Sequence, residues 1–196
     1  INGGNHLILL TASSTSISHL ELSYNFNSKV SAMSYSKINP EIRYVSTENG
    51  SFYYSMDNGQ SWNQSINFNG PDAHYFYGST IFSSPIASNV VYIGGSGYSN
   101  PAVYKSENFG QSFTPMNSGL PSTLVYDISG NDTGDLLFAA TEVGPYVYDE
   151  LEEQWFDLAG VSGPDQVYWT VEYIPELMTA RFGTYGRGIW DFQMDE

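Results

Sequence analysis

The chain has 196 residues, of which 41% are hydrophobic and 16% aromatic, and 21 acidic against 6 basic residues give a formal net charge of −15. This length and apolar content support one sizeable hydrophobic core and exclude a disordered chain. The negative charge disfavours nucleic acid and anionic membranes as partners, whereas it suits cations, neutral glycans or solubility in an extracellular medium.

The composition is typical of an all-β protein, because 16 tyrosines and 11 phenylalanines occur together with 19 glycines, as in short strands joined by tight turns. There is no cysteine, so packing alone must stabilise the fold. No apolar run approaches the roughly 20 residues that cross a bilayer, and we expect no membrane insertion. The chain begins at Ile1 without a charged and apolar leader, which leads us to expect a cleavage boundary there.

Two strands are predicted first, and no strand of their own unit precedes them. They cover residues 6–11 and 17–22. A complete unit follows, with three alternating or apolar strands and a fourth near residues 65–68. The three strands cover residues 30–35, 42–47 and 52–54.

The third strand of this unit leads into the turn Ser55-Met56-Asp57-Asn58-Gly59-Gln60-Ser61-Trp62. Asp57 can cap its own backbone, Gly59 can take a positive φ, and Trp62 can anchor the hairpin in a hydrophobic layer. The same chemistry recurs at Ser106-Glu107-Asn108-Phe109-Gly110-Gln111-Ser112-Phe113, 51 positions later when Trp62 is compared with Phe113. A spacing of this size indicates a repeated four-stranded unit.

Three further units follow the same order of strands. Their predicted strands cover residues 78–82, 90–95 and 102–105, then 124–128, 136–141 and 146–148, and finally 167–173, 177–182 and 184–190. The turn of the third unit has decayed, because Glu150 stands at the aspartate position and Glu152 at the glycine position. Trp155 keeps the aromatic anchor.

The turn motif resembles the Asp-box, or BNR, repeat, Ser-x-Asp-x-Gly-x-(Ser/Thr)-Trp. The first copy matches through Ser55, Asp57, Gly59 and Trp62, and the second keeps Ser106 and Gly110 but has Asn108 and Phe113 at the other two positions. Residues 184–190 resemble the Thr-Tyr-Gly-Arg-Gly-aliphatic-Trp ending of secreted bacterial Asp-box propellers. The resemblance implies a β-propeller like those of sialidases, xyloglucanase-type glycoside hydrolases, sortilin-type receptors and photosystem II assembly factors, which share a fold but no common function.

We therefore predict an all-β fold, a β-propeller of four-stranded antiparallel blades with Asp-box hairpin turns. About four blades and part of a fifth form a partial wheel, which the remaining blades of the same protein or another chain would complete. The expected divisions are a partial blade at residues 1–29 and blades at 30–69, 70–119, 120–162 and 163–196. In the alternative, a small closed wheel, residues 7–22 complete the blade that begins at Val167.

Two loops, residues 70–77 and 163–169, repeat the pattern Gly-Pro-Asp-x-x-Tyr-aromatic and are the candidate ligand loops. Aromatic faces beside carboxylates are typical of pyranose recognition, although Pro-Asp is also good turn chemistry and the aromatics could belong to the core. The candidate ligand-binding residues are Asp72, His74, Tyr75, Tyr77, Asp165, Tyr168 and Trp169.

Glycoside hydrolysis is the catalytic alternative, and this reaction needs two carboxylates roughly 5 to 10 Å apart. Asp72, Asp127 and Asp165 are the candidates. A sialidase is disfavoured, because the sequence has only three arginines, Arg43, Arg181 and Arg187, and no matching tyrosine and glutamate set. The three histidines share no metal-ligand spacing, and we expect no metal and no cofactor.

The function favoured by these patterns is a secreted or cell-surface module, of bacterial origin, that binds a glycan or a protein. A xyloglucanase-type hydrolase half-site with axial carboxylates is the first alternative. A protein assembly factor is the second.

Overall fold

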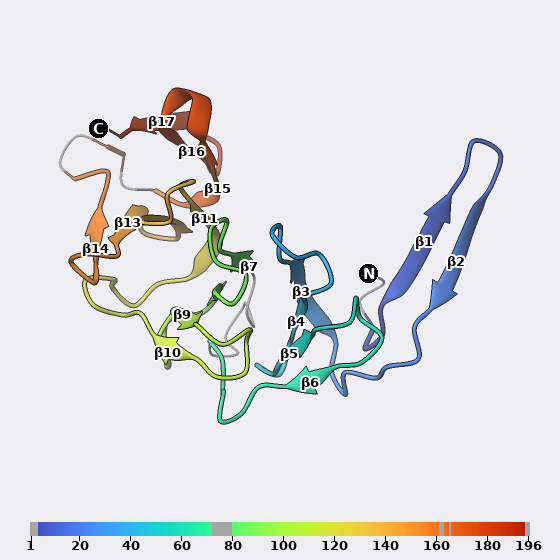
Figure 1. Ribbon diagram of the computed structural model, residues 1–196. Coiled ribbons are helices and arrows are strands. Elements are labelled where there is room, and N and C mark those ends of the chain that lie inside the picture. The colour runs from blue at the N-terminus through green and yellow to red at the C-terminus, as the bar shows by residue number, and fades with distance from the viewer. Residues whose placement is uncertain (1–3, 72–79, 161–162, 165, 195–196) are drawn as a thin grey trace.

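The computed structural model describes residues 4–71, 80–160, 163–164 and 166–194. These residues form β-strands and one short 3-10 helix, η1 (Pro175–Leu177). Figure 1 shows five separate sheets that follow one another in an open arc, from a projecting hairpin near the N-terminus to the sheet of β15, β16 and β17. No helix in this part of the chain is long and apolar enough to span a membrane.

Each sheet is an antiparallel meander in which spatial order follows chain order. The hairpin is β1 (Ile8–Ala12) and β2 (Ile17–Glu21). The first blade is β3 (Val30–Tyr35), β4 (Arg43–Thr47), β5 (Phe52–Ser55) and β6 (Asn63–Gln64). The second is β7 (Thr80–Ser83), β8 (Val91–Gly94), β9 (Val103–Ser106) and β10 (Thr114–Pro115). The third is β11 (Val125–Gly130), β12 (Leu136–Thr141), β13 (Pro145–Asp149) and β14 (Gln154–Asp157), and the fourth is β15 (Tyr168–Ile174), β16 (Thr179–Thr184) and β17 (Ile189–Gln193).

The first strands of the four blades are neighbours: β7 contacts β3 and β11, and β11 contacts β15. Meander sheets whose first strands surround a common axis are the blades of a β-propeller. The prediction of an all-β partial propeller is therefore confirmed. We call β3, β7, β11 and β15 the inner strands.

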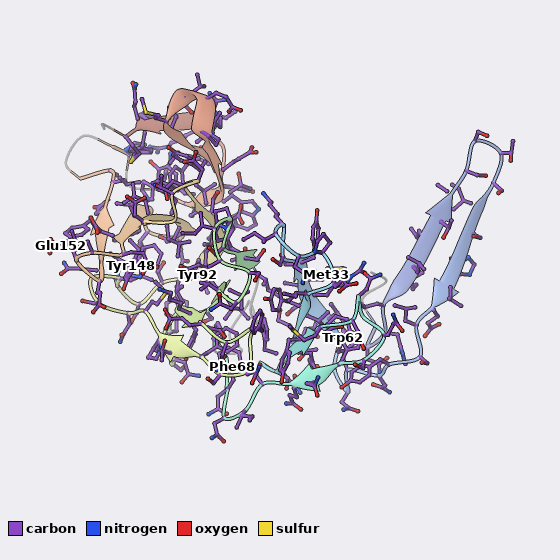
Figure 2. All side chains as sticks on the ribbon, in the orientation of Figure 1. Met33, Trp62, Phe68, Tyr92, Tyr148 and Glu152 are labelled. Carbon is purple, nitrogen blue, oxygen red and sulfur yellow. The ribbon has the colours of Figure 1, made fainter. Side chains whose placement is uncertain are left out.

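Separate hydrophobic clusters fill the interfaces between successive sheets. Tyr44 and Phe52 meet Val91 between the first and second blades. Tyr92 and Tyr148, both labelled in Figure 2, belong to the cluster between the second and third blades. A third cluster joins the third blade to the fourth. Apolar neighbours on both sides explain why β8 is buried along its whole length and β12 at every residue but its first.

The hairpin of β1 and β2 pairs only with itself among the described residues, in a register that places Leu9 opposite Leu20. The apolar side chains of this hairpin are unusually exposed, with Leu10 66% and Ile17 78% accessible to solvent. Strand β17 pairs with β16 and has no described contact with the hairpin, which lies at the other end of the arc (Figure 1). The alternative of a small wheel closed by residues 7–22 is therefore wrong for this structure.

The turn at residues 55–62 is held by a dense set of hydrogen bonds. Ser55 Oγ donates to Asp57 Oδ1 over 2.8 Å and accepts from the Gly59 N–H, also over 2.8 Å. Asp57 also accepts from the Ser61 N–H at 2.8 Å and from its hydroxyl at 2.6 Å. Asn58 and Gly59 both have a positive φ, 61° and 83°. These bonds fix the turn that delivers Trp62.

The second turn repeats this geometry with an amide in place of the carboxylate. Asn108 Oδ1 accepts from Ser106 Oγ and from the Ser112 N–H, both over 2.9 Å, and Asn108 Nδ2 donates to Ser112 Oγ. Phe113 then packs edge-on against Phe52 of the preceding blade, with ring centroids 4.8 Å apart. The anchor residue of each turn thus joins two consecutive units.

The third turn differs from the sequence interpretation. Asp149 caps it, because its Oδ1 accepts the N–H groups of Leu151 and Glu152. Glu150, which was expected at the capping position, points to the second blade instead and accepts from Lys105 Nζ and Tyr92 Oη. Asp149 pairs with the first residue of β12, as Ser55 pairs with the first residue of β4, so this turn is one residue shorter than the motif before its aromatic anchor.

The last predicted strand also needs correction, because residues 185–188 form a turn between β16 and β17. The Thr184 N–H bonds to the Gly188 carbonyl over 3.1 Å, and Gly186 and Gly188 have φ values of 87° and 83°. Strand β17 begins only at Ile189. The glycines of the Thr-Tyr-Gly-Arg-Gly segment therefore serve a turn that presents Tyr185.

Candidate ligand-binding face

The first residues of the inner strands lie at one end of the arc. The turns between the second and third strands of each blade lie at the same end. Thr80, Val125 and Tyr168 pair with residues at the ends of β8, β12 and β16. The turns that follow these strands therefore lie at the same end, which we call the strand-start face. The turns that follow the third strands lie at the opposite end, because Arg43 pairs both with Ser55 and with the last residue of β3.

Three inner strands carry a β-bulge directly after their first residue. The register shifts between Val30 and Ala32, between Val125 and Asp127, and between Tyr168 and Thr170. A bulge leaves one residue outside the regular pairing and redirects its side chain. The residues in this position are Ser31, Tyr126 and Trp169.

The rings of Tyr126 and Trp169 stack across the interface between the third and fourth blades, 4.3 Å apart and inclined by 30°. Tyr185, on the turn before β17, lies 6.3 Å from Trp169. Trp169 is 46% and Tyr185 80% exposed. We call these three residues the aromatic ladder. It offers flat apolar surface to a ligand on the strand-start face.

A polar pair lies beside the ladder. The Tyr98 hydroxyl, on the turn between β8 and β9, donates to the Glu142 carboxylate on the turn between β12 and β13. Partial burial and the nearby charge of Glu142 raise the pKa of Tyr126 above its usual value. The Glu142 N–H donates to the Leu124 carbonyl over 3.0 Å, which places this residue beside the start of the strand that carries Tyr126.

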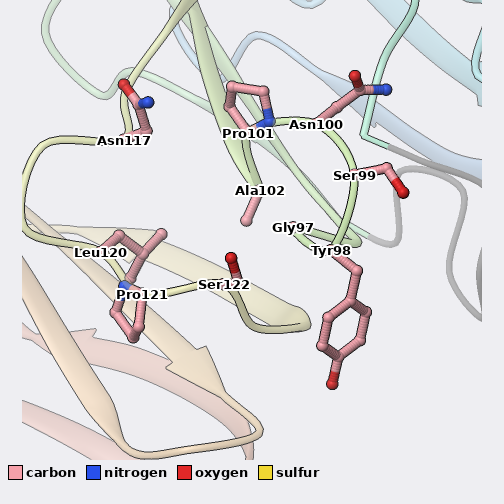
Figure 3. Close-up of a pocket in the computed structure, with 10 residues that line it drawn as sticks. All are labelled: Gly97, Tyr98, Ser99, Asn100, Pro101, Ala102, Asn117, Leu120, Pro121 and Ser122. Carbon is pink, nitrogen blue, oxygen red and sulfur yellow. The ribbon is translucent and has the colours of Figure 1, made fainter.

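Two open cavities lie on the same face. The first, of about 260 Å³, lies between the β8–β9 turn and the connection to β11, and Figure 3 shows Leu120 and Pro121 facing Ala102 across it. The second, of about 460 Å³, is lined by Pro121, Val143, Tyr146, Asp157 and Pro164, among others. The face thus combines aromatic surface, hydroxyls and carboxylates with concave shape, as a small-molecule site requires.

Asp127 is partly buried on β11 and bridges three inner strands. Its Oδ1 accepts from the Ile128 N–H at 2.9 Å and from Thr80 Oγ1 at 3.3 Å, and its Oδ2 accepts from the Val171 N–H at 3.1 Å. Burial raises its pKa above the usual value, against the lowering effect of these bonds. Because both oxygens are engaged by the fold, these contacts favour a structural role over catalysis.

The predicted ligand residues have different outcomes. Trp169 is exposed on the strand-start face, where a ligand could reach it. Tyr168 is fully buried, packs edge-on against Phe182 and donates its hydroxyl to the Pro164 carbonyl, so its predicted ligand contact is wrong. The remaining candidates, Asp72, His74, Tyr75, Tyr77 and Asp165, lie outside the described residues.

Sequence reasoning missed Tyr98, Tyr126, Glu142 and Tyr185. They come from three turns and one inner strand that share no motif, so only the blade arrangement brings them together. The signal that was available is positional: Tyr126 and Trp169 both follow the first residue of an inner strand. In the part of the chain that the structure describes, no three histidine, aspartate or glutamate side chains are grouped as a metal would need.

Comparison with known proteins supports the architecture. No family model matches the sequence. No curated protein matches it. Among solved structures, a GH74 enzyme of Niastella koreensis matches with a TM-score of 0.71 and 16% identity over 96% of this chain and 32% of that chain. An ancestral GH74 enzyme gives 0.68 and 16%, over 100% of this chain and 30% of that chain.

The computationally designed Ika4 protein matches with a TM-score of 0.61 and 12% identity, over 86% of this chain and 92% of that chain. The present chain spans about a third of the length of the two GH74 enzymes. At these identities the similarity is one of fold, and it agrees with a portion of a β-propeller.

Proposed function

We propose that the chain is part of an extracellular bacterial propeller that binds neutral glycans on its strand-start face. The observation that carries the proposal is the aromatic ladder, in which Trp169 lies between Tyr126 and Tyr185 on an exposed face. Sugar rings stack their apolar faces on such side chains, while carboxylates and hydroxyls bind the sugar hydroxyls. The charge of −15 and the nearby Glu142 disfavour anionic sugars.

We further propose membership of the Asp-box propellers. The hydrogen bonds of Asp57 and Asn108 support it, since they give the two motif copies the same turn geometry. The turns lie at the end opposite the ladder, which supports a structural role for them. The ending at residues 184–190 supports a secreted bacterial origin through its resemblance to such proteins. The remaining blades of the same protein, or another chain, would complete the wheel.

A hydrolase is the less favoured function. Among the described candidates only Asp127 is a carboxylate near the axis, and hydrogen bonds from the fold engage both of its oxygens. Asp72 and Asp165 remain predictions. Release of reducing sugar from a neutral polysaccharide, abolished by Asp72→Asn or Asp165→Asn, would favour the hydrolase over the binding module.

The binding proposal is tested on a glycan array, followed by titration of the best neutral glycan against Trp169→Ala. Loss of one stacking ring is worth about 0.5 to 1.5 kcal/mol beyond area burial, so we expect roughly a tenfold weakening of a micromolar to millimolar affinity. Tyr35→Ala is the matched control, because Tyr35 is 55% exposed but lies at the opposite end of its inner strand. Equal affinities for Trp169→Ala and the parent would contradict the proposal.

A further inference from the structure

The two cavities of the strand-start face occupy equivalent places in successive blades. The first lies between the β8–β9 turn and the connection from β10 to β11, and the second lies between the β12–β13 turn and the connection from β14 to β15. Each connection has a proline four residues before its inner strand, Pro121 before Val125 and Pro164 before Tyr168. Pro121 lines both cavities, so they adjoin. We call the two together the blade groove.

The blade groove does not depend on the ends of the arc. Its cavities belong to the second and third blades, and each of these has a described sheet on both sides. Further blades would attach beyond the hairpin or beyond the fourth blade. No residue of the hairpin or of β15, β16 and β17 lines the groove. The groove therefore belongs to the surface of a completed wheel as well as to that of the described arc.

Backbone contacts hold both walls of the first cavity in place. The Gly97 N–H donates to the Thr123 carbonyl over 2.8 Å, and a Cβ on Gly97 would come within 2.7 Å of that carbonyl oxygen. The walls approach this closely because residue 97 is a glycine. The connection that forms the second wall is bonded to the third blade, since the Trp155 N–H donates to the Ser118 carbonyl over 2.9 Å. A ligand would meet a preformed cavity, which lowers the entropic cost of binding.

The first cavity offers neutral hydrogen-bonding groups. None of its lining residues is charged, and five have a hydroxyl or an amide: Tyr98, Ser99, Asn100, Asn117 and Ser122. Figure 3 shows the Ser122 hydroxyl directed towards Ala102, in the space between the two walls. Among the described residues, none hydrogen-bonds the side chain of Asn117 or Ser122. These groups both donate and accept, as sugar hydroxyls do, so the cavity suits a neutral sugar.

The β8–β9 turn joins the groove to the strand that carries part of the aromatic ladder. Tyr98 of this turn lines the first cavity, and its hydroxyl donates to the Glu142 carboxylate. The Val125 N–H donates to the Gly95 carbonyl over 2.9 Å, which bonds β11, the strand of Tyr126, directly to the start of the turn. One wall of the groove is thus in contact with the strand on which the ladder begins.

We propose that the blade groove binds consecutive units of one linear neutral glycan, with Asn117 and Ser122 bonding the hydroxyls of the unit in the first cavity. The inference rests on the proposed function and deepens it, because it gives the glycan a course along the arc from the ladder. Affinity should then depend on chain length, since only a longer ligand contacts both the ladder and the groove.

The second cavity continues this course with a different surface. Its walls include the apolar side chains of Pro121, Val143 and Pro164, which can cover the apolar face of a sugar ring. Asp157 is its one charged lining residue, and the Asp157 Oδ1 accepts from the N–H groups of Ala159 and Gly160. No basic residue lines either cavity, which favours a neutral polysaccharide over an acidic one.

The test compares cellobiose with cellohexaose by calorimetric titration, since both are neutral and they differ only in length. We expect the parent to bind the hexamer about tenfold more tightly than the dimer. Asn117→Ala removes a bonding group and Ser122→Phe fills the cavity, so each should lose most of that gain. Trp169→Ala alters neither cavity, so it should weaken both ligands and leave the ratio of their affinities unchanged.

Gln111→Ala is the matched control, because it removes an exposed amide from the turn at the opposite end of the second blade, and it should bind as the parent does. A parent-like preference for the hexamer in both Asn117→Ala and Ser122→Phe would overturn the groove and leave the ladder proposal intact. Equal affinities of the parent for the two ligands would also overturn it. Failure of the parent to bind either ligand would instead reject the glycan function on which the groove rests. Should Ser122→Phe fail to fold, the exposed Asn117→Ala decides alone.

Discussion

Trp169 and Tyr126 stack 4.3 Å apart although they belong to the inner strands of two different blades. Both are bulge residues, and the same irregularity in each strand directs each ring to the same interface. The ladder is thus built from two equivalent departures from regular pairing. The stacked pair therefore contributes both to the packing of the fourth blade on the third and to the surface that a ligand can contact.

We predict a measurable coupling between these two rings. Tyr126→Ala and Trp169→Ala should each lower stability, and a double-mutant cycle should give about 0.5 to 1.5 kcal/mol of interaction free energy. Urea unfolding of the four variants measures it. Tyr185→Ala is the control, because an 80% exposed ring should contribute little. Purely additive effects of Tyr126 and Trp169 would show that the stacking has no energetic consequence.

The turn at residues 55–62 should make stability depend on pH in the acid range. Hydrogen bonds from the Ser61 hydroxyl and N–H and from Ser55 lower the pKa of Asp57 from 3.8 to about 2. A carboxyl with a lowered pKa in the fold stabilises it above pH 4, and this contribution is lost as the pH falls towards 2. Asp57→Asn copies the amide of Asn108 in the second turn and should flatten this part of the melting temperature profile. An unchanged slope between pH 4 and pH 2 would contradict the prediction.

Asp127 should have a pH effect of the opposite sign. Burial raises its folded pKa above 3.8, so the folded state takes up a proton before the unfolded state does as the pH falls. Its ionisation therefore costs stability at neutral pH, and that cost is relieved in the window just above pH 4. Carboxyl titration by NMR, with Asp127→Asn used to assign the signal, should show a raised pKa. A value at or below 3.8 would refute this.

The aromatic anchors should be the most costly residues to truncate. Trp62 and Trp155 are 8% and 1% exposed, and Trp155 Nε1 also donates to the Met116 carbonyl over 2.8 Å. Replacement of either by alanine should lower the free energy of unfolding by about 3 to 5 kcal/mol because it opens a cavity. Chemical denaturation of both variants measures the loss. If both variants had the same free energy of unfolding as the parent, the anchors would not hold the blades together.

The two hydrogen bonds that Glu150 of the third blade accepts from the second blade should stabilise the fold cooperatively. Glu150 accepts from Lys105 Nζ at 2.8 Å and from Tyr92 Oη at 2.9 Å, and both ionic side chains are largely shielded from solvent. Glu150→Ala would leave two donors without this acceptor, so we expect a loss of about 1.5 to 3 kcal/mol. Lys105→Met should cost less, and a double-mutant cycle should reveal coupling. The exposed Glu152→Ala serves as the control and should be neutral.

The fold could be predicted because its signals are local. The Ser55 to Trp62 turn contains its own cap, its positive-φ glycine and its anchor within eight residues, and its recurrence at residues 106–113 defines the unit. Apolar strands between such turns complete each blade. These features depend on neighbouring residues in the chain, and they are the ones that the structure confirms.

The candidate site depends on pairing that the sequence does not display. A bulge shifts the register by one residue, and a one-residue shift moves a side chain to the other face of a sheet. This is why Tyr168 is buried and Trp169 exposed, although both were predicted to contact a ligand. A similar one-residue uncertainty led to the prediction that Glu150 caps the third turn, whereas Asp149 caps it. Tyr98, Glu142 and Tyr185 lie on one face only because three blades bring their turns to it.

The hydrophobic clusters between successive sheets imply a particular kind of folding cooperativity. Because each cluster joins a sheet only to its neighbour, the free energy of the arc is approximately a sum of nearest-neighbour terms, as in repeat proteins. Blades in the middle are then held from two sides and end elements from one. Denaturation should proceed inwards from the ends, and amide hydrogens of β1 and β2 should exchange with solvent well before those of β8 and β12.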